Sequence, residues 1–333
     1  MSRPRLVLMV PLRRCGSNAL RLRLNLGTDL YSPYPLHLSD LSLKEEEKDL
    51  ADDARYFQMI VDIVGLQSHS LLRWPIAPDP LDIYEALRGE DPSRRCQWQI
   101  YGELLRRAAE HQGASVVLDK CQDSVGDFER LVELFPDILF LDLVRDPRAQ
   151  VCSMNRSILY DFDSMLNALR WAESRRWVDR VRALHPSRIQ TFRYEDLITH
   201  PETTLRAICD FIGIAFDSNM LDISQSVEAK KMASLSPLWE TNASNPNPSH
   251  IHKYKEYLSP EEINVIETIA SPWMDALGYS LSSTNRDLNI ELDLENARRR
   301  SEQRAKQAWK NLAIKYPLDH ILRQARLRYL ASL

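Results

Sequence analysis

Short apolar runs alternate with amphipathic helical patterns along most of the chain. Such runs predict buried strands, and the segments between them place apolar residues on one helical face. The predicted strands cover residues 6–10, 116–118, 138–144 and 189–192. The predicted helices include residues 42–64, 97–111, 128–134, 164–184 and 203–212. Strands that alternate with helices predict an α/β fold, with a central parallel sheet flanked by helices on both faces.

The first strand leads into a turn over residues 12–17 and then into a helix rich in leucine and arginine. Gly16 lets the backbone approach a ligand closely, and Arg14 adds a permanent forked cation. Backbone N–H groups at a helix start favour an anion, here those of Gly16, Ser17 and Asn18. The stretch predicts a phosphate-binding loop, with an ordinary strand–turn–helix connection as the alternative.

This loop is not a Walker loop, because the GxxxxGK[ST] spacing is absent. No Lys-Ser/Thr pair follows Gly16 to hold Mg²⁺, so we expect no metal at the site.

Cationic residues follow every predicted strand. Arg14 follows the first strand, Lys120 the second, Arg145 the third and Arg193 the fourth. Asp146 can cap a helix with Pro147 at its first position, which places Ser153 two turns inside that helix. Because ligands bind at the carboxyl ends of parallel strands, we expect these cations to converge on one anionic ligand.

Four motifs in this order resemble those of the sulfotransferases that use 3′-phosphoadenylyl sulfate (PAPS). Residues 14–18, RCGSN, are similar to the 5′-phosphosulfate loop of that family, and RDPR from Arg145, with Ser153, is similar to its 3′-phosphate motif. FRYEDL at 192–197 resembles the segment whose tyrosine lies near the adenine. Residues 249–279 look like its closing segment, a basic loop followed by a helix.

The resemblance spans roughly residues 5 to 280. It implies a P-loop-like sulfotransferase fold that takes PAPS as the donor substrate, with no metal. The donor-binding residues it implies are Arg14, Cys15, Gly16, Ser17, Asn18, Arg145, Ser153, Tyr194, His252 and Lys253.

The same resemblance implies that Arg14 and Lys120 neutralise charge on the bridging oxygen of the leaving phosphate. It leaves the general base open, because Gln122 stands where cytosolic members often have a histidine, and an amide cannot accept the proton. Other branches place the base in the region that here holds His37 and Asp40. His37 has the better matched pKa and is our choice, with Asp40, Asp119 and Asp123 as rivals.

Composition fits a globular enzyme and excludes a polyanion-binding protein, since the net charge is −4. The five cysteines are scattered and form no CxxC pair, which predicts reduced thiols. The first apolar run is too short for a signal peptide, and no apolar stretch reaches transmembrane length. We therefore expect a cytoplasmic protein that does not bind nucleic acid.

The last 36 residues, 298–333, form a basic tail. They contain ten Lys or Arg and two Asp or Glu, and an apolar stripe runs through residues 318–329. We expect a sulfotransferase-like α/β domain at 1–284 and a basic helical C-terminal extension at 285–333. The favoured interpretation is a helix folded against the acidic main domain. The alternatives are a membrane-surface contact or a homo-oligomer contact.

These observations predict transfer of a sulfuryl group from PAPS to a hydroxyl or amine of a carbohydrate, lipid or other small acceptor. Adenosine 3′,5′-bisphosphate would be the second product. A small-molecule kinase of the P-loop type and a non-catalytic nucleotide-binding protein are the alternatives. The sequence does not identify the acceptor.

Overall fold

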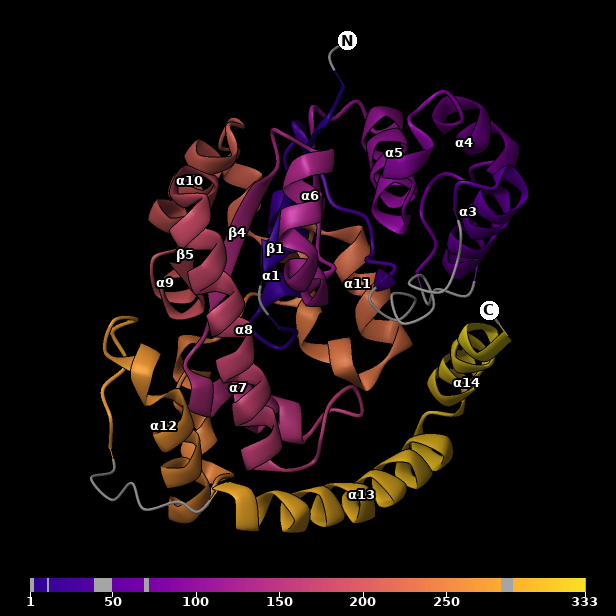
Figure 1. Ribbon diagram of the computed structural model, residues 1–333. Helices are drawn as coiled ribbons and strands as arrows, with labels where there is room; N and C mark the ends of the chain where they lie inside the picture. The colour runs from indigo at the N-terminus through magenta and orange to yellow at the C-terminus, as the bar shows by residue number, and fades with distance from the viewer. Residues whose placement is uncertain (1–2, 11, 39–49, 69–71, 283–289, 333) are drawn as a thin grey trace.

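The computed structural model describes residues 3–10, 12–38, 50–68, 72–282 and 290–332 (Figure 1). The side chains of residues 68, 122–124, 237–238 and 290–292 are also outside the described set. A five-stranded sheet in the order β2-β3-β1-β4-β5 forms the centre, and every neighbouring pair is parallel. The strands are β1 (Arg5–Val10), β2 (Leu30–Tyr31), β3 (Val116–Asp119), β4 (Leu139–Val144) and β5 (Ile189–Arg193).

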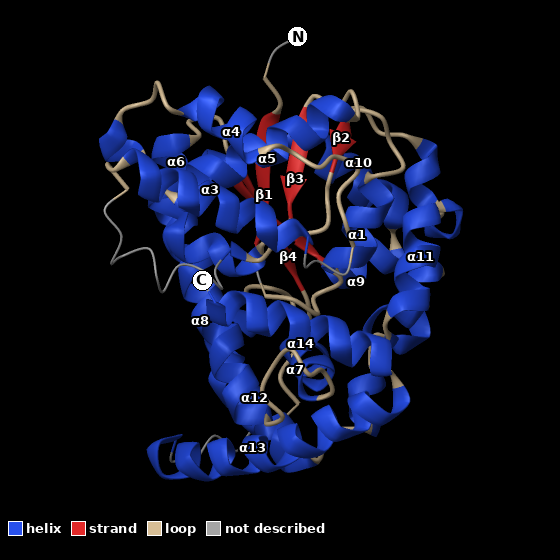
Figure 2. Cartoon of the chain, turned by 90° about the vertical axis from the view of Figure 1, so that its right-hand side faces the viewer, coloured by secondary structure: helices blue, strands red, loops and turns tan. Residues whose placement is uncertain are grey.

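Helices cover both faces of this sheet (Figure 2). Those before β4 are α1 (Ser17–Leu24), α3 (Asp53–Ser68), α4 (Pro80–Leu87), α5 (Gln97–His111) and α6 (Phe128–Leu134). Those after β4 are α7 (Pro147–Asn155), α8 (Ser164–Leu184), α9 (Tyr194–Thr199), α10 (Pro201–Ile212), α11 (Val227–Leu235), α12 (Pro260–Met274), α13 (Ile290–Lys315) and α14 (Pro317–Ser332).

The central strand β1 is buried on both faces, which explains why its sequence is continuously apolar. Side chains alternate between the two faces of a strand. Leu6, Leu8 and Val10 pack in the core beneath α3, α5 and α6. Val7 and Met9 pack in the opposite core, beneath α1 and α10. The predicted parallel α/β fold is confirmed.

The structure confirms most predicted elements and adds one strand. Helix α8 has the predicted bounds, and α5 ends at His111 just before Gly113 at φ 71°. β2 was missed, because a two-residue strand has no sequence periodicity. The predicted helix from Ser42 is described only from Asp53 onward, and its proposed start lies outside the described residues.

The C-terminal helices fold against the rest of the chain, as favoured from the sequence. In Figure 1, α13 runs along the lower edge of the molecule and α14 turns back beside the main body. Arg300 of α13 pairs with Asp163 at 2.9 Å. On α14, the Tyr329 hydroxyl donates to the carbonyl of Asp62 at 2.9 Å, and the Ser236 hydroxyl donates to Asp319 at 2.7 Å.

All five cysteines are buried thiols outside any disulfide. Within the part of the chain that the structure describes, no helix has the length and apolar character needed to cross a membrane.

Candidate active site

The loop between β1 and α1 is shaped for an anion. Gly16 precedes α1 with φ 99°, and Arg14 also has a positive φ, 75°. Helix α1 begins with no side-chain cap and no acidic residue in its first turn. Its first backbone N–H groups therefore need another partner, and the helix dipole favours a negative one. Ser17 at this helix start is buried, so water has little access to it.

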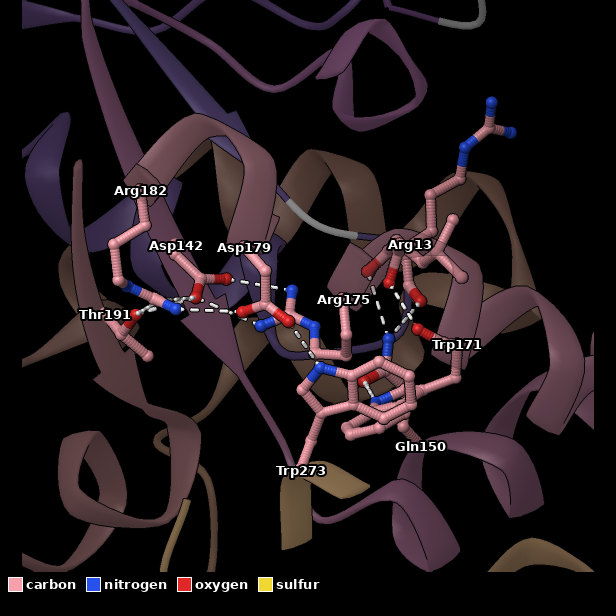
Figure 3. A network of polar contacts seen from close by, with 11 residues as sticks. Arg13, Asp142, Gln150, Trp171, Arg175, Asp179, Arg182, Thr191 and Trp273 are labelled. Atoms are coloured by element: carbon pink, nitrogen blue, oxygen red, sulfur yellow. Dashed lines mark hydrogen bonds and ion pairs between the residues drawn. The ribbon is translucent and has the colours of Figure 1, made fainter. Parts of the chain in front are cut away.

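Gln150 of α7 holds the first half of this loop. Its amide nitrogen donates to the carbonyls of Leu12 and Arg13, both at 3.1 Å. Its carbonyl oxygen accepts from Nε1 of Trp171 at 3.2 Å, and Gln150 is fully buried. In Figure 3 the side chain of Arg13 points away from this network. The network therefore fixes the backbone of Arg13, and the guanidinium of Arg13 lies outside it.

Helix α7 brings the predicted 3′-phosphate pair next to the loop. The Asp146 side chain caps the helix by accepting from the backbone N–H of Arg148 at 2.9 Å, as predicted. Arg145 donates to the carbonyl of Arg14 at 3.1 Å, and Nε of Arg14 donates to Oγ of Ser153, also at 3.1 Å. Burial, followed by the nearby charge of Arg145, lowers the pKa of Arg14. An anion bound here would offset the repulsion between the guanidinium groups of Arg14 and Arg145.

Tyr194 forms a wall of this site. The Arg145 guanidinium carbon lies 4.8 Å from the centre of the Tyr194 ring, at cation–π distance. The next residue, Glu195, is buried and accepts from the backbone N–H of Asp146 at 3.0 Å and from the Tyr279 hydroxyl at 2.8 Å. Glu195 thus joins the β5 end, the α7 start and the segment after α12. Three of the four predicted motifs meet at this carboxylate.

A cavity of about 310 Å³ lies between these elements. Seven of the ten predicted donor-site residues line it: Arg14, Gly16, Ser17, Asn18, Arg145, Ser153 and Tyr194.

 These seven residues come from the segments that follow β1, β4 and β5. The opposite wall comes from the segment before α12, which contributes mainly amides and hydroxyls. These residues are Thr241, Asn242, Ser244, Asn245, Asn247 and His250.

Three other predicted donor residues lie outside this wall. Cys15 is fully buried behind the loop, where its side chain packs in the core with Val7 and Met9. His252 and Lys253 are not among the described lining residues, and the same segment reaches the cavity through His250. Contact of His252 and Lys253 with a 3′-phosphate stays a prediction.

A second cavity of about 220 Å³ lies on the other side of the phosphate loop. It shares Arg14, Ser17 and Asn18 with the first cavity, so the two spaces meet at the loop. His37 and Lys120, both predicted catalytic residues, line this second cavity. The structure therefore brings Arg14, His37 and Lys120 to one place.

His37 is half-buried and unusual in its backbone. It has φ 56°, and Nδ1 is buried with no hydrogen-bond partner among the described residues. Burial, followed by the charges of Arg13 and Lys120, lowers its pKa well below the ordinary value. The imidazole is therefore neutral at pH 7, but it is a weaker base than the ordinary histidine pKa, on which the choice of His37 was based, would make it.

Lys120 lies directly after β3 and is buried. Burial, and then the charges of Arg21 and Arg13, lower its pKa to about 7. A bound anion would restore the ammonium form.

The rival bases are less well placed or not described. Asp119 accepts from the Tyr101 hydroxyl at 2.8 Å and from the backbone N–H of Cys121 at 3.0 Å. It is buried beneath α5 and is not among the described residues that line the second cavity. Asp40 lies outside the described residues, as do the side chains of Gln122 and Asp123.

Sequence reasoning missed the contribution of α14. This helix supplies Leu322, Arg323, Arg326, Leu327 and Leu330 to the second cavity, and α13 supplies Trp309. The available signal was the apolar stripe with adjacent arginines in the basic tail. No sequence pattern shows which part of a chain such a stripe will contact.

The parallel sheet and the loop that leads from β1 into the uncapped start of α1 define a P-loop-like α/β fold. A family model described as "Sulfotransferase family" matches residues 6–218, and a second, "Sulfotransferase domain", matches residues 161–278. The chain belongs to the sulfotransferase family.

Curated relatives agree with this assignment. Protein-tyrosine sulfotransferase 2 of Gallus gallus is 27% identical over 160 residues, which cover 45% of this chain and 42% of the relative. Protein-tyrosine sulfotransferase A of Caenorhabditis elegans is 28% identical over 159 residues, covering 45% and 41%. The chain thus spans less than half the length of the curated relatives it matches.

A solved structure shows the same fold. The sulfotransferase domain from the Synechococcus PCC 7002 olefin synthase aligns with a TM-score of 0.52 at 24% identity, covering 80% of this chain and 94% of that domain.

Proposed function

We propose that this protein transfers a sulfuryl group from PAPS to a hydroxyl, or an amine, of a small acceptor such as a carbohydrate or lipid. Adenosine 3′,5′-bisphosphate would be the second product. The observation that carries the proposal is the meeting of two cavities at Arg14, Ser17 and Asn18. A donor bound in the first cavity would present its reactive end to an acceptor in the second.

The donor fits the residues of the first cavity. The uncapped start of α1 suits a 5′-phosphosulfate, and Arg145 with Ser153 suits a 3′-phosphate. Tyr194 offers an aromatic wall to the adenine. His252 and Lys253 would approach the 3′-phosphate from the segment before α12.

PAPS, when bound, would supply an activated sulfuryl group that carries less charge than a phosphoryl group. In such transfers the protein mainly positions groups and stabilises charge. Arg14 and Lys120 would stabilise the charge that develops on the leaving phosphate, without a metal.

His37 is the proposed general base. Among the described residues no hydrogen-bond partner reaches its buried Nδ1, and the residue lines the second cavity, which is the proposed acceptor side. When the acceptor oxygen bonds to sulfur, its proton would pass to His37. The neutral state of the imidazole makes this transfer available at pH 7.

Radiolabelled PAPS offered with pooled hydroxylated and amine acceptors tests this proposal. We expect label to appear in an acceptor together with adenosine 3′,5′-bisphosphate. Label transfer from ATP instead of PAPS would favour a kinase. Nucleotide binding without transfer to any acceptor in a cell extract would favour a non-catalytic binding protein.

The cellular compartment is part of the proposal. The five cysteines are buried thiols outside any disulfide, which supports a reducing compartment such as the cytoplasm.

A further inference from the structure

Four large apolar side chains are exposed where α13 meets α14. Ile314 is 70% exposed, Tyr316 44%, Leu318 58% and Ile321 60%. Single exposed apolar residues are normal on a protein surface, whereas a group of them indicates a contact site. We call these four residues the corner patch.

The corner patch faces away from the protein body. Leu318 and Ile321 are three residues apart and share one exposed face of α14. Another face of this helix packs on the protein, where Asp319 accepts from the Ser236 hydroxyl at 2.7 Å. In Figure 1 the junction of α13 and α14 lies at the outer edge of the molecule, so a large partner can reach the patch.

Exposed cations flank the corner patch on α13. Lys306, Lys310 and Ile314 follow one another at intervals of one helical turn and share a face of α13. Lys315 belongs to the corner itself, and all three lysines are exposed.

The α14 side of the corner is also positive. Arg328 is exposed two turns after Ile321 on the same face of the helix. Within residues 303–332 the one acidic residue is Asp319, which is buried and pairs with Arg323 at 2.8 Å. The three lysines and Arg328 are in no ion pair with a described carboxylate. The exposed face therefore combines apolar side chains with positive charge.

An anionic lipid surface matches this combination best. Apolar side chains enter the boundary between headgroups and acyl chains, while flanking lysines reach the headgroup phosphates. A protein partner fits less well, because lysine is depleted at protein–protein interfaces. A nucleic acid would contact the cations through its phosphates and leave the apolar centre in water.

We propose that the corner patch docks this protein on an anionic membrane surface. Its apolar side chains insert among the lipid headgroups, and the flanking lysines lie against the phosphates. This inference goes beyond the proposed function and does not depend on it. Because another face of α14 lines the second cavity, docking also places that cavity close to the bilayer.

Vesicle flotation tests this inference with the full chain of 333 residues. Vesicles of phosphatidylcholine with phosphatidylglycerol are the anionic probe, and vesicles of phosphatidylcholine alone are the neutral one. We expect the protein to float with the anionic vesicles and to bind the neutral ones at least about tenfold more weakly. Added salt should weaken the binding to anionic vesicles, because it screens the charges.

Two double variants separate the apolar and charged parts of the surface. Leu318→Ser with Ile321→Ser removes apolar side chains, and Lys310→Gln with Lys315→Gln removes charge. Each double variant should weaken binding to anionic vesicles about tenfold.

Matched controls come from other exposed positions. Leu184→Ser removes a side chain that is 54% exposed at the end of α8, and Lys231→Gln removes an exposed cation from α11. Both controls should bind vesicles like the wild type. All variants should keep the wild-type melting temperature, since the altered side chains are exposed.

Three results overturn the inference: no flotation with anionic vesicles, equal binding to neutral and anionic vesicles, or wild-type binding by both double variants. Light scattering without vesicles provides a fourth. A dimer that Leu318→Ser with Ile321→Ser dissociates would assign the corner patch to a second copy of the chain. Absence of sulfuryl transfer by the wild-type protein would instead overturn the proposed function alone.

Discussion

The ring of Tyr194 occupies the space next to Gly16 so closely that a Cβ atom there would lie 2.1 Å from Cδ2 of the ring. Gly16 also has φ 99°, a conformation that residues with a Cβ rarely adopt. The phosphate loop and the proposed adenine wall are therefore in direct contact.

Gly16→Ala should destabilise the protein by about 1–3 kcal/mol and displace Tyr194. We expect a lower melting temperature and weaker binding of adenosine 3′,5′-bisphosphate. Gly89→Ala is the control, since a Cβ at position 89 meets no atom within 4 Å. If both variants melt and bind nucleotide like the wild type, the close approach of Tyr194 to Gly16 contributes neither to stability nor to nucleotide binding.

Arg145→Ala should weaken binding of adenosine 3′,5′-bisphosphate by about 2–3 kcal/mol, as expected for a lost charge-assisted contact. ADP, which has no 3′-phosphate, should bind poorly to both proteins. Calorimetry measures all four affinities, with Arg206→Ala as a control because Arg206 pairs with Glu202 on the surface. Equal binding of the two nucleotides by the wild type would contradict the 3′-phosphate assignment.

Turnover should persist in excess EDTA. The charge on the leaving phosphate is proposed to be neutralised by Arg14 and Lys120, so no divalent cation is needed. Rates of sulfuryl transfer with and without EDTA provide the measurement. Loss of turnover that Mg²⁺ restores would favour a kinase-type mechanism.

His37→Ala should lower kcat about 100-fold, with nucleotide affinity little changed. Asp119→Asn is the matched variant, and it should lower the melting temperature because Asp119 accepts from Tyr101. Steady-state kinetics and thermal unfolding separate the two effects. A normal kcat in His37→Ala beside an inactive Asp119→Asn enzyme would move the role to Asp119.

Binding of adenosine 3′,5′-bisphosphate should take up a proton at Lys120. Its pKa is about 7 in the free protein, so the lysine is largely neutral at pH 8, and a bound anion favours the ammonium form. Affinity should therefore rise as pH falls from about 9 towards 7. Calorimetry at pH 8 in buffers of different ionisation enthalpy measures the uptake, and Lys120→Arg, which stays charged, should reduce it. Equal uptake by both proteins would assign the proton to another group.

Much of the wall of the first cavity could be predicted from the sequence because it comes from short local segments. Arg14 to Asn18 is one continuous turn, and Arg145 directly precedes the capped start of the helix that carries Ser153. A capping aspartate and an adjacent proline mark the start of that helix. The parallel sheet then brings these segments together, because the carboxyl ends of its strands share one edge.

The lining of the second cavity could not be predicted in the same way. Arg323 and His37 lie far apart in the sequence and line one cavity only because α13 carries α14 across the molecule. The contact of Asp119 was also hidden, since only the fold shows that Tyr101 donates to it. Both arrangements depend on packing between residues that are far apart in the sequence.

The contribution of α14 to the second cavity has a practical consequence for engineering. The matches to the two family models end at residue 218 and residue 278, well before α14 begins at Pro317. A protein trimmed to the matched region would keep the residues that line the first cavity but lose the α13 and α14 side chains that line the second.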